Sequence, residues 1–297
     1  MEAGLIGLGK MGLHIAMNMQ SSGIRAYGYD IQTGPRKQAK AKGIPVVQTL
    51  QELIAALQKP RIIWLMLPAG DITESMVHQL AELLEEGDYV IDGGNSFYRD
   101  SIRNYEFLKK KKIHFYDAGT SGGIRGALEG ANFMIGGERE HFAVIEELIQ
   151  RIASDQGYLY AGDAGSGHYL KMVHNGIEYG MMQAIGEGFE LLQHSPYPYD
   201  NAQVARLWNH GSVIRSWLMK LAEEAFREDE KLDAVKGIMY ASGEGQWTVE
   251  EVMRCNVSVP VISTALMMRY RSLYEDTFTG KVVASLRKGF GGHKTAE

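Results

Sequence analysis

The sequence predicts a two-domain chain, in which an α/β domain built on a doubly wound parallel sheet precedes an all-helical domain. Short apolar runs suited to buried parallel strands alternate with helical patterns over the first half of the chain. A glycine-rich turn follows the first of these runs. Beyond about residue 165 the strand patterns stop and only helical periodicity continues. We therefore expect domains over residues 1–163 and 164–297.

The first turn has the spacing of a dinucleotide-binding motif. An apolar run over residues 3–7 predicts a strand, and the pattern Gly-x-Gly-x-x-Gly over residues 7–12 opens a helix. A second strand, over residues 25–29, leads to Asp30. In this context the first glycine makes a tight turn, the second admits a pyrophosphate, and the third allows close helix–strand packing. A glycine-rich turn without a ligand is the alternative interpretation.

Asp30 indicates which dinucleotide is bound. A carboxylate at the end of the second strand accepts hydrogen bonds from ribose hydroxyls and repels a 2′-phosphate. Arg36, six residues later, would weaken that repulsion. The sequence thus favours NAD, with NADP as the less favoured cofactor, although a solvated strand end would also explain Asp30.

The alternation continues through the first domain, as expected for a Rossmann-type sheet. Strands are predicted over residues 62–67, 89–92, 114–118 and 133–135, and helices over residues 71–84, 102–110 and 140–152. Ligands of such sheets bind at the carboxyl ends of the strands, where Pro68, Asn95 and Ser121 belong. The predicted cofactor-binding residues are Gly7, Leu8, Gly9, Lys10, Met11, Gly12, Asp30, Leu67, Pro68 and Asn95.

The first helix of the second domain carries a polar face. Lys171, His174, Asn175 and Glu178 stand at positions i, i+3, i+4 and i+7, which is one side of a helix. This face offers a base, an acid and two hydrogen-bonding groups; a solvated face with a Lys–Glu pair is the alternative. The helix is expected to run to about residue 193, with others over residues 201–209, 213–228, 232–241, 249–255 and 261–274.

Composition excludes several classes of protein. The chain has 297 residues, 45% of them hydrophobic, and a net charge of −5, which gives no footprint for nucleic acid. A single cysteine, Cys255, excludes an internal disulfide framework and fits a reducing compartment. No cysteine–histidine spacing typical of a zinc site occurs, so we expect no metal. Without a signal peptide or a membrane-length apolar run, we expect a cytoplasmic protein with no membrane association.

Four segments together resemble one family. They are the glycine turn over residues 7–12, Ile-Asp-Gly-Gly-Asn-Ser over 91–96, Gly-Thr-Ser-Gly-Gly over 119–123, and Gly-His-Tyr-Leu-Lys-Met-Val-His-Asn-Gly-Ile-Glu-Tyr over 167–179. The chain resembles the decarboxylating 6-phosphogluconate dehydrogenases in their short form, within the β-hydroxyacid dehydrogenase superfamily. Glu178 and Tyr179 discriminate, because other members of the superfamily lack this pair after the lysine and the asparagine.

The resemblance implies a reaction and roles for these residues. 6-Phosphogluconate would be oxidised by NAD and decarboxylated to ribulose 5-phosphate and CO2. Lys171 would be the general base, which requires that burial or a nearby cation lower its pKa, and Glu178 would protonate the enediol. The pathway, pentose phosphate or gluconate utilization, stays open. The implied substrate-binding residues are Asn95, Ser121, Gly122, Gly123, His174, Asn175, Tyr179, Arg269, Arg287 and His293.

The phosphate end departs from the family pattern. Ser242 and Glu244 stand where the long-form family has a lysine and a threonine, and Arg271 would be an alternative to Arg269. The resemblance implies that the tail, with Arg287 and His293, comes from a neighbouring subunit, so we expect a homodimer or homotetramer. The alternative functions are another β-hydroxyacid dehydrogenase, such as one for 3-hydroxyisobutyrate, and a non-catalytic dinucleotide-binding sensor.

Overall fold

The computed structural model describes residues 1–291, in which the chain divides into two compact units. The division lies between His174 and Asn175, inside the long helix that begins at Ser166. The domain boundary expected at residue 163 precedes that helix and stays a prediction. The N-terminal unit is α/β and the C-terminal unit is helical, so the expected fold class is confirmed.

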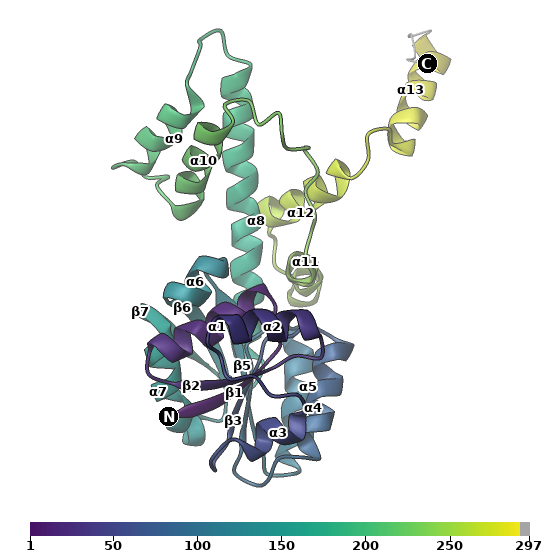
Figure 1. The fold of residues 1–297 in the computed structure, drawn as a ribbon. Coiled ribbons are helices and arrows are strands. Elements are labelled where there is room, and N and C mark those ends of the chain that lie inside the picture. Colours follow the sequence, from purple (N-terminus) through teal and green to yellow (C-terminus); the bar gives the residue numbers. More distant parts are fainter. Residues whose placement is uncertain (292–297) are drawn as a thin grey trace. The chain divides into compact units, whose positions relative to one another are not determined.

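The N-terminal unit is built on one seven-stranded sheet in the order β2-β1-β3-β4-β5-β6-β7 (Figure 1). The strands are β1 (Glu2–Ile6), β2 (Arg25–Tyr29), β3 (Ile62–Leu65), β4 (Tyr89–Asp92), β5 (His114–Ser121), β6 (Ala131–Gly137) and β7 (Ala153–Gly162). The first five pair in parallel. Strand order reverses at β1, which is where such sheets bind their ligands.

The far edge of the sheet differs from the expected all-parallel pattern. β6 runs antiparallel to β5 and parallel to β7. β5 ends at Ser121 and β6 begins at Ala131, and this connection is too short for the crossover of a dozen or more residues that parallel strands need. β7 was not predicted, because it is a largely exposed edge strand without an apolar run.

Helices cover both faces of the sheet (Figure 1). They are α1 (Lys10–Ser21), α2 (Thr33–Ala41), α3 (Leu50–Ala55), α4 (Asp71–Ala81), α5 (Tyr98–Lys109), α6 (Gly123–Glu129), the 3-10 helix η1 (Arg139–His141) and α7 (Phe142–Ile152). Trp64 packs in one buried cluster with residues of α1 and α7, while its neighbour Leu65 packs in the other with residues of α4 and α5. This alternation along β3 is the two-sided burial of a central parallel strand.

The C-terminal unit is entirely helical in its described residues. Its helices are the second part of α8 (Ser166–Gln193), α9 (Asn201–Asn209), α10 (Trp217–Glu228), α11 (Gly243–Cys255), α12 (Pro260–Ser272) and α13 (Phe278–Gly291). Two small clusters form its core, one around Tyr179 and one around Phe189. Among the described residues, no helix has both the length and the apolar content that crossing a membrane requires.

One predicted helix is wrong. Residues 232–241 form turns and irregular structure in place of the expected helix. The Asp229 carboxylate accepts hydrogen bonds from the backbone N–H groups of Lys231 and Ala234, and Leu232 has a positive φ of 54°. A side chain that bonds to nearby backbone N–H groups offers the chain an alternative to the helix, and here the turn forms.

Candidate functional site

The glycine turn after β1 is closed on its protein side and open on the other. Gly7 has a φ of 95°, and a Cβ added there would lie 2.4 Å from the Met66 carbonyl oxygen. A Cβ on Gly12 would lie 1.8 Å from the Gly7 carbonyl oxygen. A Cβ on Gly9 would meet nothing within 4 Å, and Gly9 is the N-cap of α1. The backbone thus leaves room at the helix N-terminus, where an anion is favoured.

Asp30 lies directly against this turn. One carboxylate oxygen accepts the Leu8 N–H at 2.8 Å, and the other accepts the Gln32 N–H at 2.7 Å. Arg36 donates to the Asp30 main-chain oxygen at 3.1 Å. These bonds hold a carboxylate at the end of β2 beside the place that the glycine turn leaves open, and each of its oxygens keeps a second lone pair for a ribose hydroxyl.

The turn after β4 presents Asn95. The buried Asp92 carboxylate accepts the Gly94 N–H at 3.1 Å and the Ser96 hydroxyl at 2.7 Å, which fixes the turn between them. The Asn95 Oδ1 atom is buried and has no hydrogen-bond partner among the described residues. Buried polar atoms are nearly always paired, so this oxygen fits an acceptor for a ligand hydroxyl or amide.

The loop after β3 lies beside that turn. A Cβ on Gly94 would lie 2.9 Å from the Leu67 carbonyl oxygen. The Pro68 carbonyl accepts the Thr73 hydroxyl at 2.8 Å, which ties the loop to α4. Leu67, Pro68 and Asn95 thus share the carboxyl edge of the sheet, while Lys10 and Met11 follow on the first turn of α1.

Three predicted substrate and catalytic residues meet at the end of β5. Gly119 brings α8 close, since a Cβ there would lie 2.4 Å from the Lys171 Cβ atom. The Lys171 Nζ atom lies 3.4 Å from the His174 Nδ1 atom. The His174 Nε2 atom in turn lies 3.3 Å from the Ser121 Oγ atom. If Nδ1 accepts from the lysine, Nε2 carries the proton and donates to the serine.

Two buried residues that were given no role in the sequence analysis hold the start of α8. The Asp117 carboxylate accepts the N–H groups of Gly165 at 2.6 Å and His168 at 2.7 Å. The His168 ring bonds the Ser101 hydroxyl at 2.7 Å and the Gly94 carbonyl oxygen at 3.0 Å. Burial raises the pKa of the Asp117 carboxyl, and this effect outweighs the bonds that favour its charged form.

This anchor fixes the position of Lys171. The carboxylate on β5 meets the positive end of α8, and the histidine joins the same helix turn to the turn that carries Asn95. The sequence held two signals. Asp117 is an acid inside an apolar strand, and His168 stands one helical turn before Lys171.

Three further predicted residues lie in the C-terminal unit on α8, namely Asn175, Glu178 and Tyr179. The Tyr179 hydroxyl accepts the Ser242 N–H at 2.7 Å and lies 2.9 Å from the Ser242 Oγ atom. The Arg269 guanidinium stacks 3.7 Å from the centre of the Tyr179 ring. Arg269, Tyr179 and Ser242 therefore form one polar group within this unit.

The other arginine that the sequence left open for the phosphate has a different contact. Arg271 donates to the Tyr274 carbonyl oxygen, two helical positions beyond the arginine that stacks on Tyr179. Glu244, one of the two residues that depart from the long-form pattern, is buried in the first turn of α11. A helix N-terminus stabilises such a carboxylate.

The remaining predicted substrate-binding residues are two glycines that follow β5 and two residues near the C-terminus of the chain. Gly122 and Gly123 link β5 to α6 with φ values of 114° and 59°. Arg287 is exposed on α13. His293 lies outside the described residues.

Comparison with known proteins covers both units. The model of the NAD binding domain of 6-phosphogluconate dehydrogenase matches residues 2–162. The model of the 6-phosphogluconate dehydrogenase C-terminal domain matches residues 167–288. The first match is that expected from the glycine turn and Asp30, so the expected NAD-binding domain is confirmed.

Individual relatives and one solved structure agree. YqeC of Bacillus subtilis (strain 168), itself named only provisionally as a 6-phosphogluconate dehydrogenase, is 54% identical over 295 residues, which are 99% of each chain. The NAD(+)-dependent, decarboxylating 6-phosphogluconate dehydrogenase of Haloferax volcanii is 39% identical over 298 residues, 100% of this chain and 99% of its own. The structure of Plasmodium falciparum 6-phosphogluconate dehydrogenase is similar with a TM-score of 0.84 and 30% identity, covering 100% of this chain and 66% of that one. This chain belongs to the 6-phosphogluconate dehydrogenase family of oxidoreductases.

Proposed function

We propose that the chain catalyses the NAD-dependent oxidative decarboxylation of 6-phosphogluconate to ribulose 5-phosphate and CO2. The observation that carries the proposal is the contact chain from Lys171 through His174 to Ser121, at the carboxyl edge of an NAD-binding sheet. It joins a base to two groups that can hold substrate hydroxyls and a carboxylate. Family membership supplies the substrate class.

Lys171 is the proposed general base. In its neutral form it accepts the proton of the 3-hydroxyl group, while NAD, when bound, accepts the hydride from C3. The His174 ring, 3.4 Å from the lysine nitrogen, orients that nitrogen, and its Nε2 atom would exchange the Ser121 hydroxyl for a substrate hydroxyl. The glycine turn and the Asp30 carboxylate fit this cofactor, since the turn leaves space at a helix N-terminus beside an acceptor for ribose hydroxyls.

The decarboxylation step then needs a group that stabilises negative charge. The 3-keto acid loses CO2, and the electron pair of the broken C–C bond moves toward the carbonyl group. Lys171, now protonated, stabilises the resulting enolate oxygen. Glu178, seven residues further along the same continuous helix, is the proposed acid that protonates the carbon that lost CO2. That spacing corresponds to one helix face.

Asp30 supports a preference for NAD over NADP. A 2′-phosphate on the adenosine ribose would meet a carboxylate already held by two backbone N–H groups. Arg36, which would otherwise attract that phosphate, donates to the Asp30 main-chain oxygen. The Plasmodium relative was studied with NADP+, so cofactor choice varies within the family.

Arg269, Tyr179 and Ser242 are the residues that we propose bind the substrate phosphate. A guanidinium held over an aromatic ring is pre-oriented, and it pairs well with phosphate oxygens. A small hydroxy acid such as 3-hydroxyisobutyrate offers nothing for this group to bind, which is why we rank that substrate second. A sensor without catalysis ranks third, because both Lys171 and Glu178 are present.

The test is NADH and CO2 formation from 6-phosphogluconate, with 3-hydroxyisobutyrate as the competing substrate and NADP as the competing cofactor. We expect both products with the phosphorylated acid and NAD, and loss of turnover with retained NAD binding in Lys171→Met. Activity with the small acid alone would refute 6-phosphogluconate as the substrate. Full activity of Lys171→Met would refute the assignment of Lys171 as the general base.

We also propose a homodimer or homotetramer. Large apolar side chains of the C-terminal unit are exposed in the single chain, including Trp217 at 48%, Met253 at 80% and Phe278 at 81%. An interface between subunits would bury such exposed apolar side chains. Light scattering on the full chain tests the assembly, and truncation before Arg287 tests whether the tail contributes to the sugar-phosphate site. A monomer in light scattering would refute the proposed assembly. Undiminished activity of the truncated chain would refute the role of the tail.

A further inference from the structure

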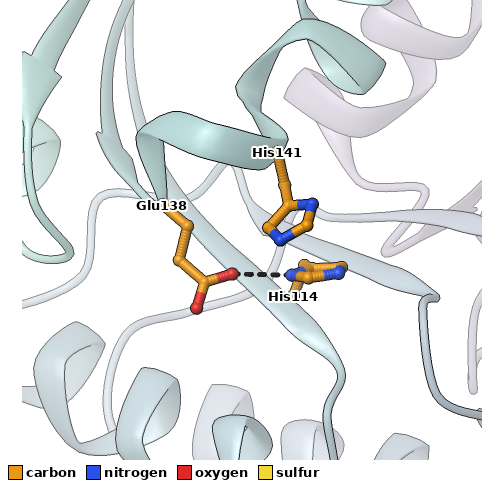
Figure 2. Close-up of side chains that lie close together, drawn as sticks. All are labelled: His114, Glu138 and His141. Atoms are coloured by element: carbon orange, nitrogen blue, oxygen red, sulfur yellow. Dashed lines mark hydrogen bonds and ion pairs between the residues drawn. The ribbon is translucent and has the colours of Figure 1, made fainter.

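A second group of potential ligands lies at the amino edge of the sheet, away from the proposed active site. His114 is the first residue of β5, Glu138 follows the last residue of β6, and His141 ends η1. The antiparallel pairing of β5 with β6 brings the start of one strand beside the end of the other. Figure 2 shows the three side chains turned toward one another.

Their donor atoms are already close enough to share one ion. One ligand atom from each residue lies within 4.8 Å of the others. The His114 Nδ1 atom is 2.6 Å from a Glu138 carboxylate oxygen. Ligands about 2.0–2.2 Å from a tetrahedral zinc ion are roughly 3.3 Å apart, so small side-chain rotations suffice. His141 is exposed, which leaves an entry path and room for a water ligand.

The surrounding residues orient these ligands. The Tyr105 hydroxyl donates to the second Glu138 carboxylate oxygen at 3.1 Å. The Tyr116 hydroxyl donates to the Glu138 main-chain oxygen at 2.7 Å. Tyr89 lies against the His114 ring, with the two ring centres 4.7 Å apart. Metal-binding carboxylates and imidazoles are usually held by such outer contacts.

An ordinary His–Glu hydrogen bond explains only two of the three residues. The ring centres of His114 and His141 are 4.0 Å apart, so two imidazoles stand beside one carboxylate. A metal ion binds imidazole rings through nitrogen, so one ion would bind both rings. Two imidazole nitrogens and one carboxylate oxygen suit zinc-class ions, and suit magnesium or calcium poorly.

We propose that His114, Glu138 and His141 bind a divalent transition-metal ion of the zinc class. The sequence predicted no metal, because only the strand pairing brings these residues together. β5 separates His114 from Ser121 by roughly 23 Å at about 3.3 Å per residue. The ion therefore takes no part in the proposed reaction. It joins β5 to η1 and stabilises the folded N-terminal unit, because a ligand that binds only the folded state raises its stability.

The experiment is titration of the full-length protein with Zn2+, followed by calorimetry, and with Co2+, followed by visible absorption. We expect one ion per chain and cobalt bands typical of fewer than six ligands. We also expect a thermal midpoint raised by a few degrees with Zn2+ and unchanged with Mg2+. His141→Ala removes an exposed ligand without disturbing the core and should weaken binding by roughly a hundredfold.

Two further variants make the test decisive. Glu138→Gln keeps a hydrogen-bonding group beside His114 but loses the charge, and it should also weaken binding. His194→Ala changes an exposed histidine just after the C-terminal end of α8, whose ring Nδ1 atom lies 2.9 Å from the Glu190 carbonyl oxygen, and this variant should bind Zn2+ as the unchanged protein does. Absence of one-to-one Zn2+ binding, or equal binding by His141→Ala, would overturn the proposal. Neither result depends on which reaction the chain catalyses.

Discussion

Gly119→Ala should damage catalysis through the position of one helix. The added Cβ would lie 2.4 Å from the Lys171 Cβ atom and 3.2 Å from the Gly167 carbonyl oxygen. Carbon atoms in contact prefer about 3.5–4.0 Å, so α8 and β5 must separate by at least about 1 Å. Neither neighbour is the end of a flexible side chain, because one is a Cβ atom and the other is backbone. The whole first turn of α8 therefore has to move.

The size of the effect follows from that shift. Inserting a methyl group into a packed contact costs about 1–3 kcal/mol of stability. Displacing a catalytic group by about 1 Å lowers turnover by roughly a hundredfold. NAD binding should be retained, because the glycine turn after β1 is not part of this contact. The assay is steady-state NADH formation, with thermal unfolding and NAD affinity measured on the same preparation.

A matched control lies on the same helix. Gly188 is also in α8, and a Cβ there would meet nothing within 4 Å. Gly188→Ala should leave kcat unchanged and stabilise the helix by up to about 1 kcal/mol, because alanine is the better helix former. If Gly119→Ala retained the turnover of the unchanged protein, then either α8 tolerates the methyl group in place or the nitrogen of Lys171 is not the base. Both outcomes would refute the reasoning.

Two other perturbations test the cofactor site and the helix anchor. Asp30→Ala should weaken the binding of NAD more than that of NADP. The substitution removes an acceptor for the ribose hydroxyls of NAD, and it removes the repulsion of the 2′-phosphate of NADP. Equal losses in both affinities would contradict the assignment of Asp30 to the ribose. Burial raises the pKa of Asp117 in the folded state, so its contribution to stability is present at low pH and is lost as the pH rises. The stability of the protein relative to Asp117→Asn should therefore fall from pH 4 upward in unfolding measurements, and a constant difference would argue against the raised pKa.

The sequence predicted what depends on local pattern. Strand, glycine turn and acid fall within thirty residues, so the nucleotide-binding half follows from nearest neighbours along the chain. The long helix carrying Lys171 was equally evident, because its periodicity continues over many turns. The antiparallel direction of β6 was not predicted, although the link from Ser121 to Ala131 is too short for a parallel crossover.

What the sequence did not predict depends on contacts between distant segments. Asp117 and His168 matter because β5 receives the first turn of α8, and a distance of 51 residues along the chain separates them. The cluster of His114, Glu138 and His141 likewise needs the pairing of β5 with β6. Residues 232–241 were wrongly predicted to form a helix, because their pattern is helical. The Asp229 side chain just before them accepts a hydrogen bond from the Ala234 N–H, and a turn forms instead. Propensity is a weak prior where such a turn competes.

The proposed phosphate-binding residues allow a prediction with its own internal control. Arg269 and Arg271 lie two residues apart on α12, but only Arg269 stacks on Tyr179. Hydrogen bonds to charged groups contribute about 1.5–3 kcal/mol, so Arg269→Met should lower kcat/KM for 6-phosphogluconate by roughly ten- to a hundredfold. Arg271→Met removes the same charge from the same helix and should have little effect.

A second substrate separates phosphate recognition from a general loss of structure. Gluconate has the reacting groups of 6-phosphogluconate without the phosphate, so it gives Arg269 nothing to bind. Arg269→Met should therefore leave the slow turnover of gluconate unchanged while it weakens the phosphorylated substrate. Equal losses with both substrates would mean that the stacked arginine supports the fold around Tyr179 and binds no phosphate. A larger loss of kcat/KM in Arg271→Met than in Arg269→Met would assign the phosphate to Arg271. The cation–π pair of Arg269 with Tyr179 would then be a structural contact.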